Sequence, residues 1–420
     1  MQVFKNKSDL SFIIKASFAV FITYLSMYAF RKPFTAAQFN NIKLWGVDYK
    51  ILLIIFQLIG YTLSKYFGIK IIAELSASKR TIFLIVLMSV AWVSLLLFGL
   101  IPAPYNLPFM FLNGLPLGMI WGVVFSYIEG RRHTELLGVA MASTFIISSG
   151  VVKAVGSYLL FNLHVSEMWM PFFTGLVFLP VLFLGVNLLH SLAVPNEDDI
   201  KARTERVPMK SQERKAFYKH FSPGILFSVF IYVCLTIFRD LRDNFAVEFW
   251  KSIGLKNIPM MFVISELPIA FLVITIIGSM VFIKNNKNAF FINFLIVFIG
   301  GMLLLLSTLL FFNNLLNATL WMVVVGFAIY LPYIAFHALF FERWIAYFKI
   351  KSNIGFLMYV ADAAGYLGST LVLLFKNFNN TQYSWVSFFT FSATITSIII
   401  IILSIANYIY FKKLDKLQLA

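Results

Sequence analysis

Three polar side chains in the run "YLSMYAFRKPF" have the types and the spacing to bind an anion. Tyr24, Tyr28 and Arg31 are separated by four and then three residues, which places them on one face of a helix. A guanidinium group matches a phosphate or a carboxylate with two parallel hydrogen bonds, and neighbouring hydroxyl groups can set the orientation of the bound group. The spacing therefore predicts an anion-binding face.

The same spacing recurs in the second half of the chain. Tyr232, Thr236 and Arg239 repeat it in "YVCLTIFR", which aligns without gaps with "YLSMYAFR" and shares its Tyr, Phe and Arg. A weaker likeness links "FSYIEGRR" at 125–132 with "HALFFERW" at 337–344. These likenesses indicate an internal repeat in which Arg31 and Arg239 occupy equivalent positions.

Other cations could join the same site. Tyr61 and Lys65 are four residues apart, so a hydroxyl group and a point charge would share one helix face. Lys153 lies in another apolar run and is a further candidate for binding the anion. For Lys65 and Lys153 the alternative is that each side chain extends to a polar surface or pairs with a neighbouring helix.

These residues lie in a strongly apolar chain. Of its 420 residues, 60% are hydrophobic and 12% are charged, and the mean hydropathy is +0.86, which is typical of a multi-pass membrane protein. The single cysteine, Cys234, excludes a disulfide framework. A membrane-spanning helix needs about twenty mostly apolar residues. Twelve segments meet this requirement: 11–40, 48–71, 81–102, 107–128, 135–161, 168–192, 222–248, 258–283, 289–312, 318–342, 353–376 and 384–411.

One polar insert separates the sixth and seventh segments. It divides the chain into a first six-helix bundle at 1–192, a central loop at 193–221 and a second six-helix bundle at 222–420. Lys and Arg are concentrated in one alternate set of loops, which includes both termini and the insert, so we expect these to be cytoplasmic in a bacterial inner membrane. Most of the net charge of +16 then reflects topology, which excludes a nucleic-acid partner.

Both repeated arginines are predicted to lie near the middle of the membrane. Counting back from the outer ends of their segments, at about 1.5 Å per residue, places each arginine roughly 15 Å deep. A charge at that depth costs about 2.5–3.5 kcal/mol even on the most lenient scale, so it normally faces a water-filled cavity or a partner. Pro33 should also kink the first segment beside Arg31.

Acidic side chains offer a second interpretation, in which the arginines are paired within the protein. The candidates are Asp240, Asp243, Glu266 and Asp362. Asp240 directly follows Arg239, whereas Glu266 and Asp362 lie in the eighth and eleventh segments and could instead carry protons. His337, in the tenth segment, could relay a proton or form a hydrogen bond between helices.

Three glycines in the fourth segment have a different meaning. Gly114, Gly118 and Gly122 follow one another at intervals of four residues, so they lie on one helix face. Small residues at this spacing let two helix backbones approach closely. The pattern predicts a helix-packing face.

The motifs around Arg31 carry a family resemblance. "YLSMYAFRKPF", followed by "GYTLSKYFG" at 60–68, resembles spans one and two of the organophosphate:phosphate antiporters of the major facilitator superfamily, and "GYLGS" at 365–369 resembles the glycine-rich eleventh span of that group. The resemblance implies an all-α integral membrane fold, with twelve transmembrane helices in two pseudo-symmetric six-helix halves. Where that group has a histidine in span five, this chain has Ile147, and Lys153 is a candidate replacement. The resemblance implies that the phosphate site is lined by Arg31, Arg239, Lys65, Tyr24, Tyr28 and Tyr61.

Together these features predict a carrier for a small anion. The expected anion is a phosphorylated metabolite that is exchanged for inorganic phosphate, with Arg31 and Arg239 binding it from opposite sides and with access alternating between the two faces of the membrane. Two alternatives remain open. One is a proton-coupled carboxylate or sugar-acid symporter that uses Asp362 or Glu266, and the other is a receptor that binds an anion without transporting it.

Enzymatic activity is not expected. The sequence shows no nucleophile with a base, no metal-ligand cluster and no phosphate-binding glycine loop, and it gives no reason to expect a cofactor. The expected partners are a small anionic substrate and membrane lipid, and we expect the chain to act as a monomer.

Overall fold

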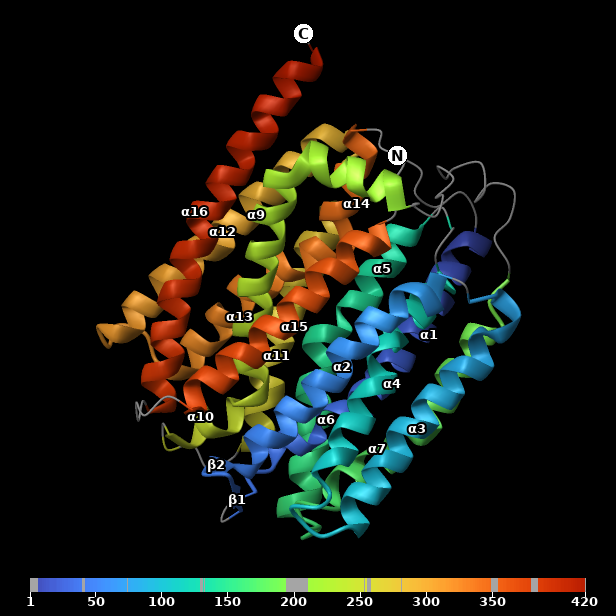
Figure 1. Ribbon diagram of the computed structural model, residues 1–420, viewed down its shortest axis with the longest axis vertical. Helices are drawn as coiled ribbons and strands as arrows, with labels where there is room; N and C mark the ends of the chain where they lie inside the picture. The colour runs from blue at the N-terminus through green and yellow to red at the C-terminus, as the bar shows by residue number, and fades with distance from the viewer. Residues whose placement is uncertain are drawn as a thin grey trace. The chain divides into compact units, whose positions relative to one another are not determined.

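The computed structural model consists almost entirely of α-helices (Figure 1). It describes residues 7–39, 42–73, 75–128, 131, 133–193, 211–252, 254, 258–280, 282–348, 354–378 and 384–419. The chain folds into two compact units. Unit 1 is Met1–Glu205 with Asn257–Val263, and unit 2 is Arg206–Lys256 with Ile264–Ala420.

Unit 1 is a helical bundle with one small hairpin. Its helices are α1 (Lys7–Arg31), α2 (Tyr49–Ala73), α3 (Arg80–Leu100), α4 (Leu107–Phe125), α5 (Thr134–Ala142), α6 (Thr144–Phe161) and α7 (Met170–His190). Two short 3-10 helices, η1 (Pro33–Ala36) and η2 (Ala77–Lys79), and the antiparallel strands β1 (Lys43–Leu44) and β2 (Val47–Asp48) connect them. Within the bundle, α2 packs along α4 and α1 packs along α7.

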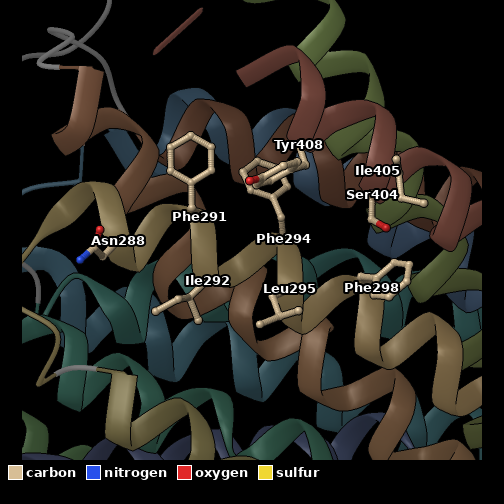
Figure 2. Close-up of a pocket in the computed structure, with 9 residues that line it drawn as sticks. All are labelled: Asn288, Phe291, Ile292, Phe294, Leu295, Phe298, Ser404, Ile405 and Tyr408. Atoms are coloured by element: carbon tan, nitrogen blue, oxygen red, sulfur yellow. The ribbon is translucent and has the colours of Figure 1, made fainter. Parts of the chain in front are cut away.

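Unit 2 is also a helical bundle. Its elements are α9 (Ser211–Asn244), α10 (Ala246–Ser252), most of α11 (Ile258–Met280), α12 (Asn286–Phe312), α13 (Ala318–Ala335), the π-helical turn η3 (Phe336–Phe340), α14 (Phe341–Phe348), α15 (Ile354–Phe378) and α16 (Trp385–Leu419). Helix α9 packs against α15 and α16, and α12 packs against α13 and α16. A pocket of about 580 Å³ lies between α12 and α16 (Figure 2).

Most of the described helices are long and apolar enough to cross a membrane. Eleven helices meet both conditions, and the apolar helix Ile264–Met280 within α11 is shorter. Eleven of the twelve predicted segments thus correspond to helices of spanning length, and the predicted segment 258–283 corresponds to the shorter one. The chain is therefore an all-α protein of the integral, multi-pass membrane type.

The first helix ends earlier than the predicted segment 11–40. Helix α1 stops at Arg31, and η1 begins at Pro33 with all four of its residues buried. Proline has no backbone N–H, and its ring clashes with the preceding turn, so the α-helix cannot continue through it. The predicted break in the helix beside Arg31 is confirmed.

The predicted central loop at 193–221 is shorter than expected. Helix α9 begins at Ser211, so residues 211–221 are helical, and residues 194–210 lie outside the described residues. Phe217 and Phe221 are buried and lie 5.9 and 5.7 Å from the ring of Trp344, which gives this polar stretch an apolar side to pack. The helix bends at Phe221, two residues before Pro223.

Two of the three glycines of α4, Gly114 and Gly118, form the close packing face that their spacing predicts. A Cβ atom at Gly114 would collide with the backbone carbonyl of Gln57 and lie 3.1 Å from the backbone nitrogen of Tyr61. A Cβ atom at Gly118 would lie 2.6 Å from Cβ of Ser64. The absence of side chains at Gly114 and Gly118 therefore allows α2 to lie directly on α4.

We predict that Gly114→Ala lowers the free energy of unfolding by about 1–3 kcal/mol, because the new methyl group would force the backbones of α2 and α4 apart. Gly278→Ala in α11 is the matched control, since a Cβ atom there meets nothing within 4 Å. Melting temperatures in detergent would test this. An equal or higher melting temperature for Gly114→Ala than for Gly278→Ala would contradict the packing described.

Candidate functional site

Aromatic rings surround the predicted anion-binding face of α1. Tyr24 is buried and lies edge-on to Tyr28, Trp121 and Phe145, with ring centroids 5.8, 5.2 and 5.9 Å away. Trp121 from α4 and Phe145 from α6 also stack on each other, at 4.9 Å. These contacts hold the tyrosine face of α1 against α4 and α6.

Arg31 and Lys65 meet at one aromatic ring. The guanidinium carbon of Arg31 lies 3.9 Å from the centroid of the Tyr61 ring, and the ammonium nitrogen of Lys65 lies 5.3 Å from it. The exposed fractions of Arg31 and Lys65 are 3% and 2%, so Lys65 does not extend to a polar surface. Both contacts have the geometry of cation–π interactions. The structure thus brings together three residues that the sequence predicted, from α1 and α2.

Two buried amides that the sequence reasoning missed hold the end of α1 in place. The Gln57 side chain donates hydrogen bonds to the carbonyl oxygen of Arg31 (2.9 Å) and to Oδ1 of Asn113 (2.7 Å). Asn113 in turn donates to the carbonyl oxygens of Phe30 (3.0 Å) and Ala91 (2.9 Å). A helix end leaves its last carbonyl groups without helical partners, and these amides satisfy two of them. The available signal was the presence of amide side chains within apolar segments.

Lys153 and Lys50 are two further buried cations of unit 1. Lys153, in α6, is 3% exposed and lies one turn before Gly156, where a Cβ atom would be 3.6 Å from Pro33. Its helix face therefore packs toward the break in the first segment. Lys50, which the sequence reasoning did not select, donates to the carbonyl oxygen of Thr35 at 2.8 Å and so supports η1.

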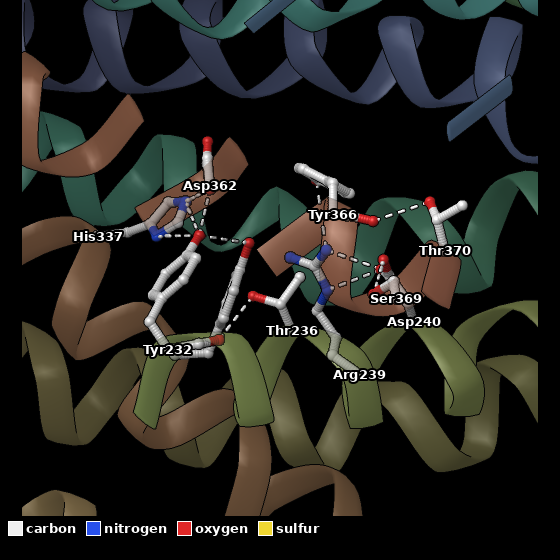
Figure 3. Close-up of polar contacts among 10 residues, drawn as sticks. Tyr232, Thr236, Arg239, Asp240, His337, Asp362, Tyr366, Ser369 and Thr370 are labelled. Atoms are coloured by element: carbon white, nitrogen blue, oxygen red, sulfur yellow. Dashed lines mark hydrogen bonds and ion pairs between the residues drawn. The ribbon is translucent and has the colours of Figure 1, made fainter. Parts of the chain in front are cut away.

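Arg239 in unit 2 is paired with its neighbour in the chain (Figure 3). Its Nη2 lies 2.8 Å from Oδ1 of Asp240 and donates to the Tyr366 hydroxyl at 3.3 Å, and its guanidinium carbon lies 4.3 Å from the centroid of the Tyr333 ring. Ser369 donates to the other carboxylate oxygen of Asp240, at 3.0 Å. The pairing of Arg239 with a local acid, which the sequence left as an alternative, is therefore present.

A second buried cluster in unit 2 joins a carboxylate, an imidazole and two phenols (Figure 3). The Tyr232 hydroxyl donates to Oδ1 of Asp362 and lies 3.2 Å from the Tyr333 hydroxyl. His337 Nε2 lies 3.4 Å from the Tyr232 hydroxyl and 3.9 Å from Oδ1 of Asp362. His337 belongs to η3, and π-helical turns are frequent at functional sites. In this cluster, whose side chains come from α9, α13, η3 and α15, the Asp362 carboxylate and the His337 imidazole are the two groups that can take up a proton.

Thr236 does not join this cluster through its hydroxyl group. The hydroxyl donates to the carbonyl oxygen of Tyr232 within the same helix, at 2.8 Å. The rest of the side chain fills the space beside Gly365, where a Cβ atom would lie 2.8 to 3.0 Å from three Thr236 atoms. Thr236 therefore serves the packing of α9 on α15 rather than the predicted polar face.

Glu266 forms an ion pair with Arg242. Oε1 of Glu266 lies 2.7 Å from Nη1 of Arg242, whose other terminal nitrogen donates to the carbonyl oxygen of Met322 at 3.3 Å. A Cβ atom at Gly326 would lie 2.8 Å from that nitrogen, so only glycine leaves room for the guanidinium group. The sequence left proton transfer and pairing open for Glu266, and the structure places it in a pair.

We predict that Glu266→Gln lowers the free energy of unfolding by about 3 kcal/mol, because it leaves the buried Arg242 charge with less compensation. Replacing both residues, as Arg242→Met with Glu266→Met, removes the charges together and should cost less than the single change. Thermal unfolding of the wild type, of Arg242→Met and Glu266→Met alone, and of the double variant would measure the coupling. A double variant as unstable as the sum of the single variants would contradict the pairing.

The arrangement also bears on metals and cofactors. The described residues contain no group of three or more His, Cys, Asp or Glu side chains that could hold a metal ion. The buried charged groups instead lie among tyrosine hydroxyls and aromatic rings. Such surroundings suit the binding of an anion or the transfer of a proton.

Comparisons with known proteins agree with the architecture. Solved structures with a similar fold include the major facilitator superfamily proton:xylose symporter XylE bound to 6-bromo-6-deoxy-D-glucose, with a TM-score of 0.59, 14% identity and coverage of 94% of this chain and 95% of that chain. They also include a variant of the nucleoside transporter NupG, with a TM-score of 0.60, 11% identity and coverage of 94% and 98%. The chain therefore has the major facilitator fold.

A comparison of sequences identifies the family. None of the curated proteins matches the chain. Residues 33–414, which are most of the chain, match the sequence family described as "Family of unknown function (DUF5690)". The chain thus belongs to the DUF5690 family.

Proposed function

We propose that this chain is a secondary transporter of a small organic anion. The observation that carries the proposal is the position of Arg31 and Lys65, two buried cations that both lie over the Tyr61 ring. An anion beside that ring could accept hydrogen bonds from both cations at once, and Tyr24 and Tyr28 of α1 would help to orient it. Buried cations in membrane helices are costly and are usually retained for function.

The specific substrate that we propose is a phosphorylated metabolite, exchanged for inorganic phosphate by alternating access. A phosphate group suits the pair because arginine can bind it bidentately while lysine adds a point charge. The structural matches bear on the fold alone, so the substrate is argued from these residues and from the resemblance around Arg31. Lys153 would add charge as the anion moves along unit 1.

Arg239 has a different part in this proposal. Asp240 already compensates the charge of Arg239, at 2.8 Å. We propose that Arg239 contacts the anion at one stage of the cycle and returns to Asp240 at the others. An exchange of partners of this kind avoids leaving a buried charge uncompensated at any stage.

We predict that Arg31→Lys lowers phosphate exchange at least about ten-fold, because lysine cannot make the bidentate contact. The assay is uptake of labelled phosphate into proteoliposomes preloaded with unlabelled phosphate. Arg80→Lys is the matched control, since the Arg80 guanidinium also lies over a tyrosine ring, 5.8 Å from the centroid of Tyr127, but at the start of α3.

The control should change the exchange rate less than about two-fold. Exchange that is equal in Arg31→Lys and Arg80→Lys would contradict the assignment of Arg31. A wild type that exchanges neither phosphate nor phosphorylated compounds would contradict the substrate class. Binding of the anion without any flux would instead indicate a receptor.

The buried cluster of Tyr232, His337 and Asp362 favours a second candidate function, proton-coupled symport of a carboxylate or sugar acid. The Asp362 carboxylate accepts from a tyrosine hydroxyl and lies 3.9 Å from an imidazole nitrogen, so two neighbouring groups, the carboxylate and the imidazole, could take up a proton. A similar fold supports proton coupling in the xylose symporter named above. Glu266 is the weaker candidate for the proton site because Arg242 pairs with it at 2.7 Å.

We predict for this candidate that Asp362→Asn removes the acceleration of uptake by an imposed pH gradient but leaves exchange at equal pH, since asparagine cannot take up the proton. Asp48→Asn is the control, because Asp48 is exposed and pairs with Lys43 on the surface, at 3.8 Å. Uptake of labelled carboxylates with and without the gradient measures the effect. A gradient response that survives in Asp362→Asn would rule out this carboxylate as the proton site.

A further inference from the structure

The pocket between α12 and α16 lies outside the residues that the proposed transport function uses. Its volume of about 580 Å³ falls within the usual range of ligand pockets, roughly 300–1,000 Å³. Figure 2 shows a row of α12 side chains, among them Phe291, Leu295 and Phe298, with Ser404, Ile405 and Tyr408 contributed by α16. Most of this lining is apolar, and Leu295 and Ile405 are exposed on it.

One end of the α12–α16 pocket, called the basic end below, has a lysine at its edge. The Lys412 ammonium nitrogen lies 5.2 Å from the centroid of the Phe291 ring, which lines the pocket, so a positive charge lies at its edge. Asn288, an exposed amide, lines the pocket one helical turn before Phe291. The described residues 282–293 and 408–417 contain one acid, Asp415, and five lysines: Lys284, Lys287, Lys412, Lys413 and Lys416.

The single acid does not cancel this charge. Asp415 accepts from the Tyr347 hydroxyl and lies 2.8 Å from the ammonium nitrogen of Lys287, so it compensates a lysine of α12. Asp415 thus compensates Lys287, and the Lys412 charge at the edge of the pocket makes its basic end positive. A pocket with an apolar wall and a cationic end is complementary to an amphiphile with a negative head group.

We propose that the α12–α16 pocket binds one anionic phospholipid, with an acyl chain against the apolar wall and the phosphate near Lys412 and Asn288. In a membrane, lipid acyl chains surround these apolar helices, so an acyl chain can bind against the apolar side chains of the pocket. A zwitterionic head group carries its own cation, which offsets the attraction of its phosphate to the lysine, whereas phosphatidylglycerol carries only the negative charge. Free phosphate would use the basic end but leave the apolar wall unoccupied.

Lipid binding to delipidated protein tests the proposal. Purified wild type is titrated with phosphatidylglycerol or phosphatidylcholine in detergent, and bound lipid is counted by native mass spectrometry. We expect the wild type to bind phosphatidylglycerol more tightly than phosphatidylcholine, by about five-fold for each lysine near the phosphate. Lys412→Gln should lower the affinity for phosphatidylglycerol about five-fold. Lys70→Gln, an exposed lysine of α2, should leave both affinities unchanged.

Large side chains that fill the pocket test whether its apolar wall binds the acyl chain. Leu295→Trp, and Ile405→Trp from the opposite wall, should weaken the binding of both lipids. Leu309→Trp is the matched control, since Leu309 is an exposed leucine of the same helix that does not line the pocket. Melting temperatures verify that each variant is folded, and the two filling variants provide independent tests.

Three results would overturn the proposal. The first is equal affinity of the wild type for the two lipids. The second is a phosphatidylglycerol affinity of Lys412→Gln that equals that of Lys70→Gln. A lipid affinity of both Leu295→Trp and Ile405→Trp that equals that of Leu309→Trp would count equally against the proposal. The third is a dimer of the delipidated wild type that Leu295→Trp and Ile405→Trp abolish, because a second copy of the chain would then occupy the pocket.

Discussion

The site in unit 1 depends on one constraint: a helix that ends within an apolar bundle must still have its last carbonyl groups hydrogen-bonded. Pro33 ends α1 directly after Arg31, and the carbonyl oxygens of Phe30 and Arg31 accept hydrogen bonds from Asn113 and Gln57. An unsatisfied carbonyl in such surroundings would cost several kcal/mol. The amides that prevent this cost also fix the position of the Arg31 backbone beside the Tyr61 ring. The glycines of α4 then allow α2, which carries Tyr61 and Lys65, to lie close enough to complete the cluster.

Arg31 and Arg239, which the sequence repeat relates, both lie over tyrosine rings. In unit 1, Arg31 shares the Tyr61 ring with Lys65. In unit 2, Arg239 lies over the Tyr333 ring and pairs with Asp240, and Glu266 pairs with Arg242. The two cations on one ring underlie the proposal that unit 1 binds the substrate anion, and the Asp362 carboxylate beside His337 underlies the second candidate, a proton site in unit 2.

Helix periodicity accounts for what could be predicted from the sequence. The residues Tyr24, Tyr28 and Arg31 share a face because spacing along one helix is a local property, and the same holds for Tyr61 with Lys65. The residues that complete the sites come from distant segments: Asn113 from α4, Tyr333 from α13 and Tyr366 from α15. No local pattern indicates which helices pack together, and a list of acids does not reveal which one pairs with Arg239. The start of α9 was missed because burial of Phe217 and Phe221 on Trp344 outweighs a polar local sequence.

The central claim is that the buried cations of unit 1 bind an anion, and equilibrium binding tests it most directly. Labelled inorganic phosphate is titrated into purified protein in detergent, with wild type and Lys65→Met compared at one ionic strength. The account predicts saturable binding that phosphorylated compounds displace and that Lys65→Met weakens at least about ten-fold, since it loses a charged hydrogen-bond donor. Equal binding by both proteins, or no saturable binding of phosphate or of carboxylates to the wild type, would contradict it.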